Sequence, residues 1–118
     1  IVFNSLGQLR YLSCIKHVDA VVGNSSSGIA EVPSFKKPTI NIGDRQKGRL
    51  KAKSIIDCLP SKDSILNAIN KAFSEEFKLE LQGSINPYGK GGASDKVVKI
   101  LENYEFKNVL KKTFYDLG

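Results

Sequence analysis

Short apolar runs that end in polar turns constrain this chain more than any other feature of its sequence. Three such runs cover residues 19–23 (DAVVG), 38–42 (PTINI) and 54–57 (SIID). Runs of this length, bounded by turn residues and containing β-branched side chains, are typical of strands buried in a parallel sheet. Segments with helical periodicity lie before and after them. The pattern predicts the α/β fold class, with a Rossmann-like, three-layer parallel sheet.

Helical periodicity marks four longer segments. The first covers residues from about 6 to 17, and Ser5-Leu-Gly-Gln8 at its start has the form of a capping box. Ser61 is placed to cap a second helix, whose apolar face comprises Ile65, Leu66, Ile69, Ala72 and Phe73. A third begins at Ser94 and Asp95, with an apolar stripe formed by Val97, Val98, Leu101 and Tyr104. Residues 106–115 predict a tail helix, with an apolar face formed by Phe106, Val109, Leu110 and Phe114.

Length and composition fit one folded domain. The chain has 118 residues, of which 41% are hydrophobic and 25% are charged, close to average globular usage. No apolar run approaches the roughly 20 residues of a membrane span, and no secretory signal is visible, so we expect a cytoplasmic protein without a membrane partner. The chain contains no Met and opens on Ile-Val-Phe, which has the character of a strand interior. We therefore interpret residues 1–118 as a fragment.

The cysteines and the histidine do not indicate a metal site. Cys14 and Cys58 lack CxxC spacing and a companion histidine cluster, so neither zinc nor a disulfide framework is predicted. Both are expected to be buried thiols. His17 falls at the end of the first helix, where an imidazolium suits the negative end of the helix dipole. We predict no metal, no cofactor and a structural role for His17.

The net charge of +6 is concentrated in one segment. Residues 36–53 carry seven Lys and Arg against a single acid, Asp44, whereas the rest of the chain is balanced. A local basic segment in an otherwise neutral domain indicates either an anionic partner or a solvated loop. We expect one or two of these cations to bind a ligand and the others to be solvated.

The serine-rich turn at residues 24–27 carries the most specific chemistry in the sequence. It follows the first predicted strand and opens a short helix that Pro33 interrupts. Open α/β sheets bind ligands at this place, and serine hydroxyls with free backbone N–H groups suit a phosphate. Glu31 lies one turn farther on, and a carboxylate there can accept hydrogen bonds from a vicinal diol such as a ribose. Arg45 follows the neighbouring strand, and its planar fork suits a diphosphate.

Ordinary structural roles explain the same residues individually. Serines before a helix are common N-caps, and a glutamate near a helix N-terminus compensates the dipole. Convergence of Arg45 on the serine turn favours a nucleotide site, because the carboxyl ends of neighbouring parallel strands meet at one edge of a sheet.

The motifs resemble those of the UDP-N-acetylglucosamine 2-epimerases, most closely the hydrolysing branch that makes N-acetylmannosamine for sialic-acid-type sugars. The resemblance rests on residues 23–35 (GNSSSGIAEVPSF), residues 38–49 (PTINIGDRQKGR) and residues 86–89 (NPYG). It implies the C-terminal half of a glycosyltransferase-B fold, with the N-terminal catalytic half absent. Lys90 departs from the resemblance, because the family usually has an acid there.

The resemblance also assigns roles to particular residues. It implies that Ser25 and Ser26 bind the phosphates, that Glu31 binds the ribose hydroxyls, that Arg45 lies near the diphosphate, and that the backbone of Leu6 lies near the uracil. It implies elimination of UDP with proton removal at C2, followed by addition of water. The catalytic carboxylates of the family belong to the missing half, so this chain is expected to bind UDP or a UDP-sugar without catalysing the reaction.

Two other functions stay open at this point. One is the donor-binding domain of a non-hydrolysing epimerase or a glycosyltransferase with the same architecture. The other is a basic module that binds nucleic acid through residues 36–53, which the absence of aromatic residues from that segment disfavours. We expect the missing N-terminal domain as a partner, no nucleic acid, and a homo-oligomer in which the apolar face of the tail helix is covered.

Overall fold

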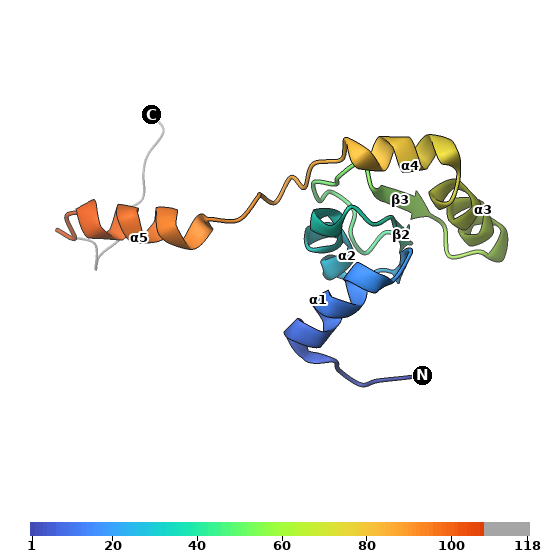
Figure 1. Cartoon of the computed structure of the whole chain (residues 1–118), viewed down its shortest axis with the longest axis horizontal. Helices are drawn as coiled ribbons and strands as arrows, with labels where there is room; N and C mark the ends of the chain where they lie inside the picture. Colours follow the sequence, from blue (N-terminus) through green and yellow to red (C-terminus); the bar gives the residue numbers. More distant parts are fainter. Residues whose placement is uncertain (108–118) are drawn as a thin grey trace, which may run out of the picture.

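The computed structural model describes residues 1–107. Its centre is a parallel sheet of β1 (Val21–Gly23), β2 (Thr39–Ile42) and β3 (Ile55–Cys58), in the order β1-β2-β3 (Figure 1). Gly23 pairs with Asn41, and Asn41 pairs with Asp57. All three predicted strands are confirmed, with bounds that differ by one or two residues.

Helices cover both faces of the sheet. The helix α2 (Ser26–Ala30) and the 3-10 helix η1 (Val32–Phe35) connect β1 to β2, and α3 (Lys62–Ala72) and α4 (Glu75–Gln82) follow β3. Thr39 Oγ1 donates to the carbonyl of Gly28 in α2 at 2.9 Å, whereas the next residue, Ile40, belongs to the core that α3 and α4 cover. Successive strand residues point to opposite faces, so the three-layer prediction is confirmed.

The main core lies between the sheet and the pair α3–α4. It is formed by Ile40, Ile56, Ala68, Ala72, Phe77 and Leu81. The apolar face predicted for α3 is partly wrong, because Leu66 and Phe73 are about half exposed while Ala68 is buried. Alanines let a helix approach a sheet closely, so the small side chains take the contact and the larger ones lie at its margins.

Serine caps set the starts of the two core helices. Ser61 caps α3 by accepting from the N–H of Ser64, as predicted, and Ser74 caps α4 by accepting from the N–H of Phe77 at 3.2 Å. The helix α4 was not predicted, although Ser74 followed by Glu75 and Glu76 is a helix-start signal. Its two buried residues, Phe77 and Leu81, are one turn apart.

Three expectations for the N-terminal part and the cysteines are wrong. The helix α1 (Gly7–His17) forms as predicted, but Leu6 is its N-cap and Ser5 Oγ accepts from the N–H of Gly7 instead of forming a capping box. Residues 1–3 form no strand in the described structure, because an extended segment becomes a strand only when it pairs with another. Cys14 is exposed, since Ile15 is the residue that α1 buries, and Cys58 is partly buried.

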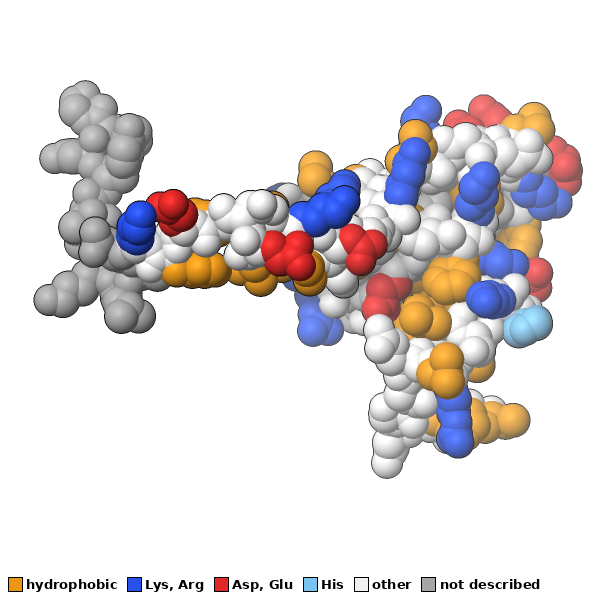
Figure 2. Space-filling view, turned by 60° about the vertical axis from the view of Figure 1, so that its left-hand side comes forward, with side chains coloured by type: hydrophobic (Ala, Val, Ile, Leu, Met, Phe, Trp, Pro, Cys, Tyr) orange, Lys and Arg blue, Asp and Glu red, His pale blue; other side chains and the backbone are white. Residues whose placement is uncertain are grey.

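The helix α5 (Ala93–Asn103) extends away from the sheet after the loop at residues 83–92 (Figure 1). Its predicted stripe of Val97, Val98, Leu101 and Tyr104 is about half exposed, and apolar side chains line one side of this arm in Figure 2. Phe106 contacts Tyr104 edge to face, at 5.1 Å between ring centroids. The rest of the predicted tail-helix face lies outside the described residues. None of the described helices has the length and hydropathy of a membrane span.

Candidate functional site

The turns after β1 and β2 lie together at the carboxyl edge of the sheet, as the sequence predicts. Gln46, in the loop after β2, donates from Nε2 to the carbonyl of Asn24 in the serine turn at 2.7 Å. Gln46 is only 3% exposed, so this contact is an internal tie between the two loops. The tie places Arg45, the preceding residue, at the edge that the serine turn occupies.

A cavity of about 640 Å³ brings two of the predicted site residues together. Leu6, before α1, and Glu31, at the junction of α2 and η1, both line it. The other lining residues are Phe3, Ser5, Gly7, Gln8, Tyr11 and Ser27. The cavity lining therefore combines apolar side chains, a carboxylate and hydroxyl groups, which can accommodate a base and a sugar.

A row of hydroxyls connects this cavity to the serine turn. Tyr11 Oη lies 2.7 Å from Ser27 Oγ, and Ser27 Oγ donates to Ser25 Oγ at 3.2 Å. Ser25 is also the N-cap of α2, because its hydroxyl accepts from the N–H of Ser27. Ser25 therefore has the capping role that is the structural alternative to ligand binding. Its hydrogen bonds with Ser27 hold the Ser25 side chain in place.

Ser25, Ser26 and Arg45 do not line this cavity. Ser26 and Arg45 are exposed at the same edge of the sheet, where charged and hydroxyl groups remain free to meet an anion. The helix α2 has only five residues, so its dipole is small and a phosphate must depend more on hydroxyls and Arg45 than the sequence suggested.

Sequence reasoning missed Tyr11, Ser27 and Gln46. Ser27 belongs to the same serine run as Ser25 and Ser26, so the motif could have indicated it as a site residue. Tyr11 carries a hydroxyl one turn into α1, but its partner lies 16 residues away. Gln46 lies among the cations of the basic segment, and only the fold shows that it is buried.

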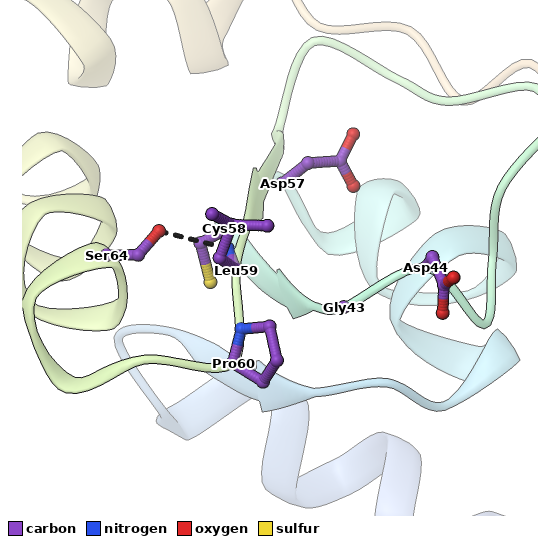
Figure 3. A pocket seen from close by; sticks show the side chains of 7 residues that line it. All are labelled: Gly43, Asp44, Asp57, Cys58, Leu59, Pro60 and Ser64. Carbon is purple, nitrogen blue, oxygen red and sulfur yellow. Dashed lines mark hydrogen bonds between the residues drawn. The ribbon is translucent and has the colours of Figure 1, made fainter.

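A second cavity, of about 520 Å³, lies at the carboxyl ends of β2 and β3 (Figure 3). It is lined by Gly43, Asp44, Asp57, Cys58, Leu59, Pro60 and Ser64. Ser64 Oγ points to the backbone of Leu59 and accepts from its N–H at 2.9 Å. Burial, and then the charge of Asp57, raise the pKa of the Cys58 thiol. Two carboxylates and a protonated thiol disfavour a diphosphate in this cavity.

Two lysines of the basic segment have structural partners. Lys51 pairs with Asp57 at 2.7 Å, and Lys36 donates to the carbonyl of Gln82 at the end of α4 at 3.0 Å. Burial raises the pKa of Asp57, but hydrogen bonds from Lys51 and Asn41 and the charge on Lys51 outweigh it, so this pKa lies below its ordinary value of 3.8. Because of these contacts, fewer lysines of the basic segment are free to bind a polyanion such as nucleic acid.

The lowered pKa of Asp57 predicts a stability change in acid. A depressed carboxyl pKa stabilises the folded state above pH 3.8, and this contribution is lost as the pH falls through the lower, folded value. We expect Asp57→Asn to lower the free energy of unfolding at about pH 6 and to have a smaller effect at about pH 2. Urea denaturation at both pH values measures this, and an equal effect at both contradicts it.

The loop at residues 83–92 contacts the α2–η1 junction and the basic segment. Asn86 Nδ2 donates to the carbonyl of Ala30 at 2.8 Å and to Ser34 Oγ at 2.7 Å, and Asn86 Oδ1 accepts from the N–H of Tyr88. Tyr88 Oη donates to the carbonyl of Leu50 in the basic segment at 3.1 Å. The loop therefore ties together the α2–η1 junction and the segment after β2.

Comparison with known proteins shows the family of this chain. The family model described as UDP-N-acetylglucosamine 2-epimerase matches residues 1–102. The chain belongs to the UDP-N-acetylglucosamine 2-epimerase family. It is 46% identical, over 91% of its length, to the polysialic acid biosynthesis protein P7 of Escherichia coli. It is also 46% identical, over 98% of its length, to a protein of Campylobacter jejuni named GDP/UDP-N,N'-diacetylbacillosamine 2-epimerase (hydrolyzing).

A third relative of this epimerase-family chain is the UDP-N-acetylglucosamine 2-epimerase of Neisseria meningitidis, 35% identical over the whole chain. The chain covers only 28%, 30% and 31% of these three relatives, respectively. It therefore spans less than a third of the length of each of these relatives.

Proposed function

We propose that this chain is the C-terminal, UDP-binding domain of a hydrolysing UDP-N-acetylglucosamine 2-epimerase, with a glycosyltransferase-B architecture in the whole protein. The full-length enzyme converts UDP-N-acetylglucosamine and water into N-acetylmannosamine and UDP. A diacetamido sugar is the alternative substrate, which the name of the Campylobacter jejuni relative favours. The cytoplasm and a homo-oligomer are the location and assembly that we expect.

One observation carries the proposal. Leu6 and Glu31 are 25 positions apart in the sequence, yet both line the cavity that the serine turn borders through Ser27. In the proposed complex the uracil lies near the backbone of Leu6 and the ribose hydroxyls donate to Glu31. Ser25, Ser26 and Arg45 bind the diphosphate at the adjoining edge. Two contacts to the nucleoside and three to the phosphates then describe one UDP.

The chemistry that these residues perform is stabilisation of the leaving group. Elimination of UDP develops charge on the diphosphate, and Arg45 with the serine hydroxyls stabilises that charge. Removal of the proton at C2 needs a base, which the resemblance assigns to the N-terminal half. We therefore expect the chain to bind UDP without epimerase activity.

Calorimetric titration of the chain with UDP tests this proposal. We expect saturable one-to-one binding that Glu31→Ala weakens by about 10- to 100-fold, because hydrogen bonds to a charged group contribute about 1.5–3 kcal/mol. Glu76→Ala, an exposed acid on α4, is the matched control and leaves binding unchanged. Equal affinity of the wild-type chain and Glu31→Ala contradicts the site.

The same titration separates the alternatives. A nucleic-acid module predicts binding to single-stranded DNA that falls steeply with salt and no specific binding of UDP. A non-hydrolysing epimerase or a glycosyltransferase donor domain also binds UDP, so full-length protein assayed for release of free N-acetylmannosamine distinguishes these from the hydrolysing enzyme.

A further inference from the structure

The junction between α2 and η1 contains a carbonyl that the local backbone leaves without its usual donor. A 3-10 turn carries hydrogen bonds from each N–H to the carbonyl three residues earlier. Pro33 has no N–H, so the carbonyl of Ala30 cannot receive this bond. Asn86 Nδ2 donates to that carbonyl at 2.8 Å, from a residue 56 positions away. A distant side chain thus replaces a bond that the sequence of the junction removes.

Asn86 holds the junction from both sides of Glu31. Its amide nitrogen also donates to Ser34 Oγ at 2.7 Å, so one NH2 group bridges residues 30 and 34. The N–H of Tyr88 donates to Asn86 Oδ1 at 3.0 Å, which fixes the orientation of the amide plane. Both hydrogens and the oxygen of the side chain are therefore engaged, and Asn86 has little freedom to rotate.

Glu31 is the first of the three residues, 31–33, that this bridge encloses. It is at once the C-cap of α2 and the N-cap of η1, where the backbone changes from one helix type to the other. It lines the cavity shared with Leu6 and also the groove that Asn86 borders. Small changes at the junction therefore move the Glu31 carboxylate.

We propose that Asn86 is a positioning residue that gives the site its selectivity for ribonucleotides over 2′-deoxyribonucleotides. The inference rests on the proposed role of Glu31. A carboxylate that accepts hydrogen bonds from two neighbouring hydroxyls must lie within about 0.5 Å of the position that suits both, because both bonds depend on its distance and angle. Asn86 supplies that placement by holding the backbone carbonyl of Ala30 before Glu31 and the side-chain hydroxyl of Ser34 after it. The substrate class that this arrangement selects is a nucleotide with a free vicinal diol.

The ratio of the dissociation constants for 2′-deoxy-UDP and UDP tests this role. We expect the wild-type chain to bind UDP about tenfold or more tightly than 2′-deoxy-UDP, because the deoxy ligand lacks one hydrogen bond to a charged group. Asn86→Asp keeps the size and the acceptor oxygen but loses both donor hydrogens, so we expect the preference to fall to about twofold or less. Partial unfolding lowers both affinities equally and leaves the ratio unchanged.

Matched variants separate the possible outcomes. Asn70→Asp, on an exposed position of α3, introduces the same change elsewhere and keeps the wild-type ratio. Tyr88→Phe removes only the bond to Leu50 and also keeps the ratio. Ser34→Ala removes one of the two acceptors and lowers the ratio partly, which provides a second test that does not alter Asn86.

Two results overturn different statements. A wild-type ratio in both Asn86→Asp and Ser34→Ala, with the preference lost in Glu31→Ala, overturns the positioning role and leaves the proposed function intact. A preference that survives Glu31→Ala overturns the assignment of Glu31 to the ribose, and with it the role proposed for Asn86.

Discussion

We expect Arg45→Ala to lower the affinity of the chain for UDP by about 10- to 100-fold while changing the affinity for uridine by less than about twofold. A charge-assisted, paired contact between guanidinium and diphosphate contributes about 1.5–3 kcal/mol, and each 1.4 kcal/mol is about tenfold in affinity. Uridine lacks the phosphates, so it does not use this contact. Calorimetry with both ligands measures the difference.

Arg49→Ala is the matched control for this prediction. Arg49 lies in the same loop and is also exposed, and its backbone N–H donates to the carbonyl of Gln46 at 3.4 Å, a bond that the substitution keeps. We expect less than about a threefold effect on UDP, because in the proposed complex Arg45 and not Arg49 contacts the diphosphate, and an exposed charge without a paired contact contributes little. Equal losses for the two arginines indicate general attraction by the basic segment instead of a specific role for Arg45.

We expect Gly28→Ala to lower the free energy of unfolding by about 1–3 kcal/mol, the usual cost of overpacking a core. A Cβ on Gly28 would lie 2.8 Å from Thr39 Cγ2. Thr39 is buried, and its hydroxyl donates to the carbonyl of Gly28, so the methyl group cannot rotate away without losing that bond. The strain therefore acts on the contact between α2 and β2.

Thr39→Ser in the Gly28→Ala background isolates the contact. Serine keeps the hydroxyl and lacks the methyl, so the double variant regains much of the stability that Gly28→Ala loses. Gly83→Ala is the control, since its Cβ would have no neighbour nearer than 3.9 Å and the glycine has φ −87°. Urea denaturation measures all variants. Additive effects of the two substitutions contradict the clash as the cause.

The helices and strands that depend on interactions between neighbouring residues could be predicted from sequence periodicity. The strands β1, β2 and β3 and the start of α3 follow from apolar runs, turn residues and a serine cap, which act over a few neighbours. The relation of the serine turn to the loop after β2 was also predictable, because parallel strands end at the same edge. Leu6 and Glu31 were named through the family resemblance, and only the fold brings them to one cavity.

The amino-acid pattern alone was enough to predict the α/β class, the position of the serine turn and the concentration of positive charge after β2. The contacts between distant residues required the folded structure: the hydroxyls of Tyr11 and Ser27, the Gln46 amide with the carbonyl of Asn24, and the Asn86 amide with the carbonyl of Ala30. The reason is physical. Hydrogen bonds between residues 16 to 56 positions apart depend on how helices pack against the sheet, and packing is a property of the whole chain that no local spacing encodes.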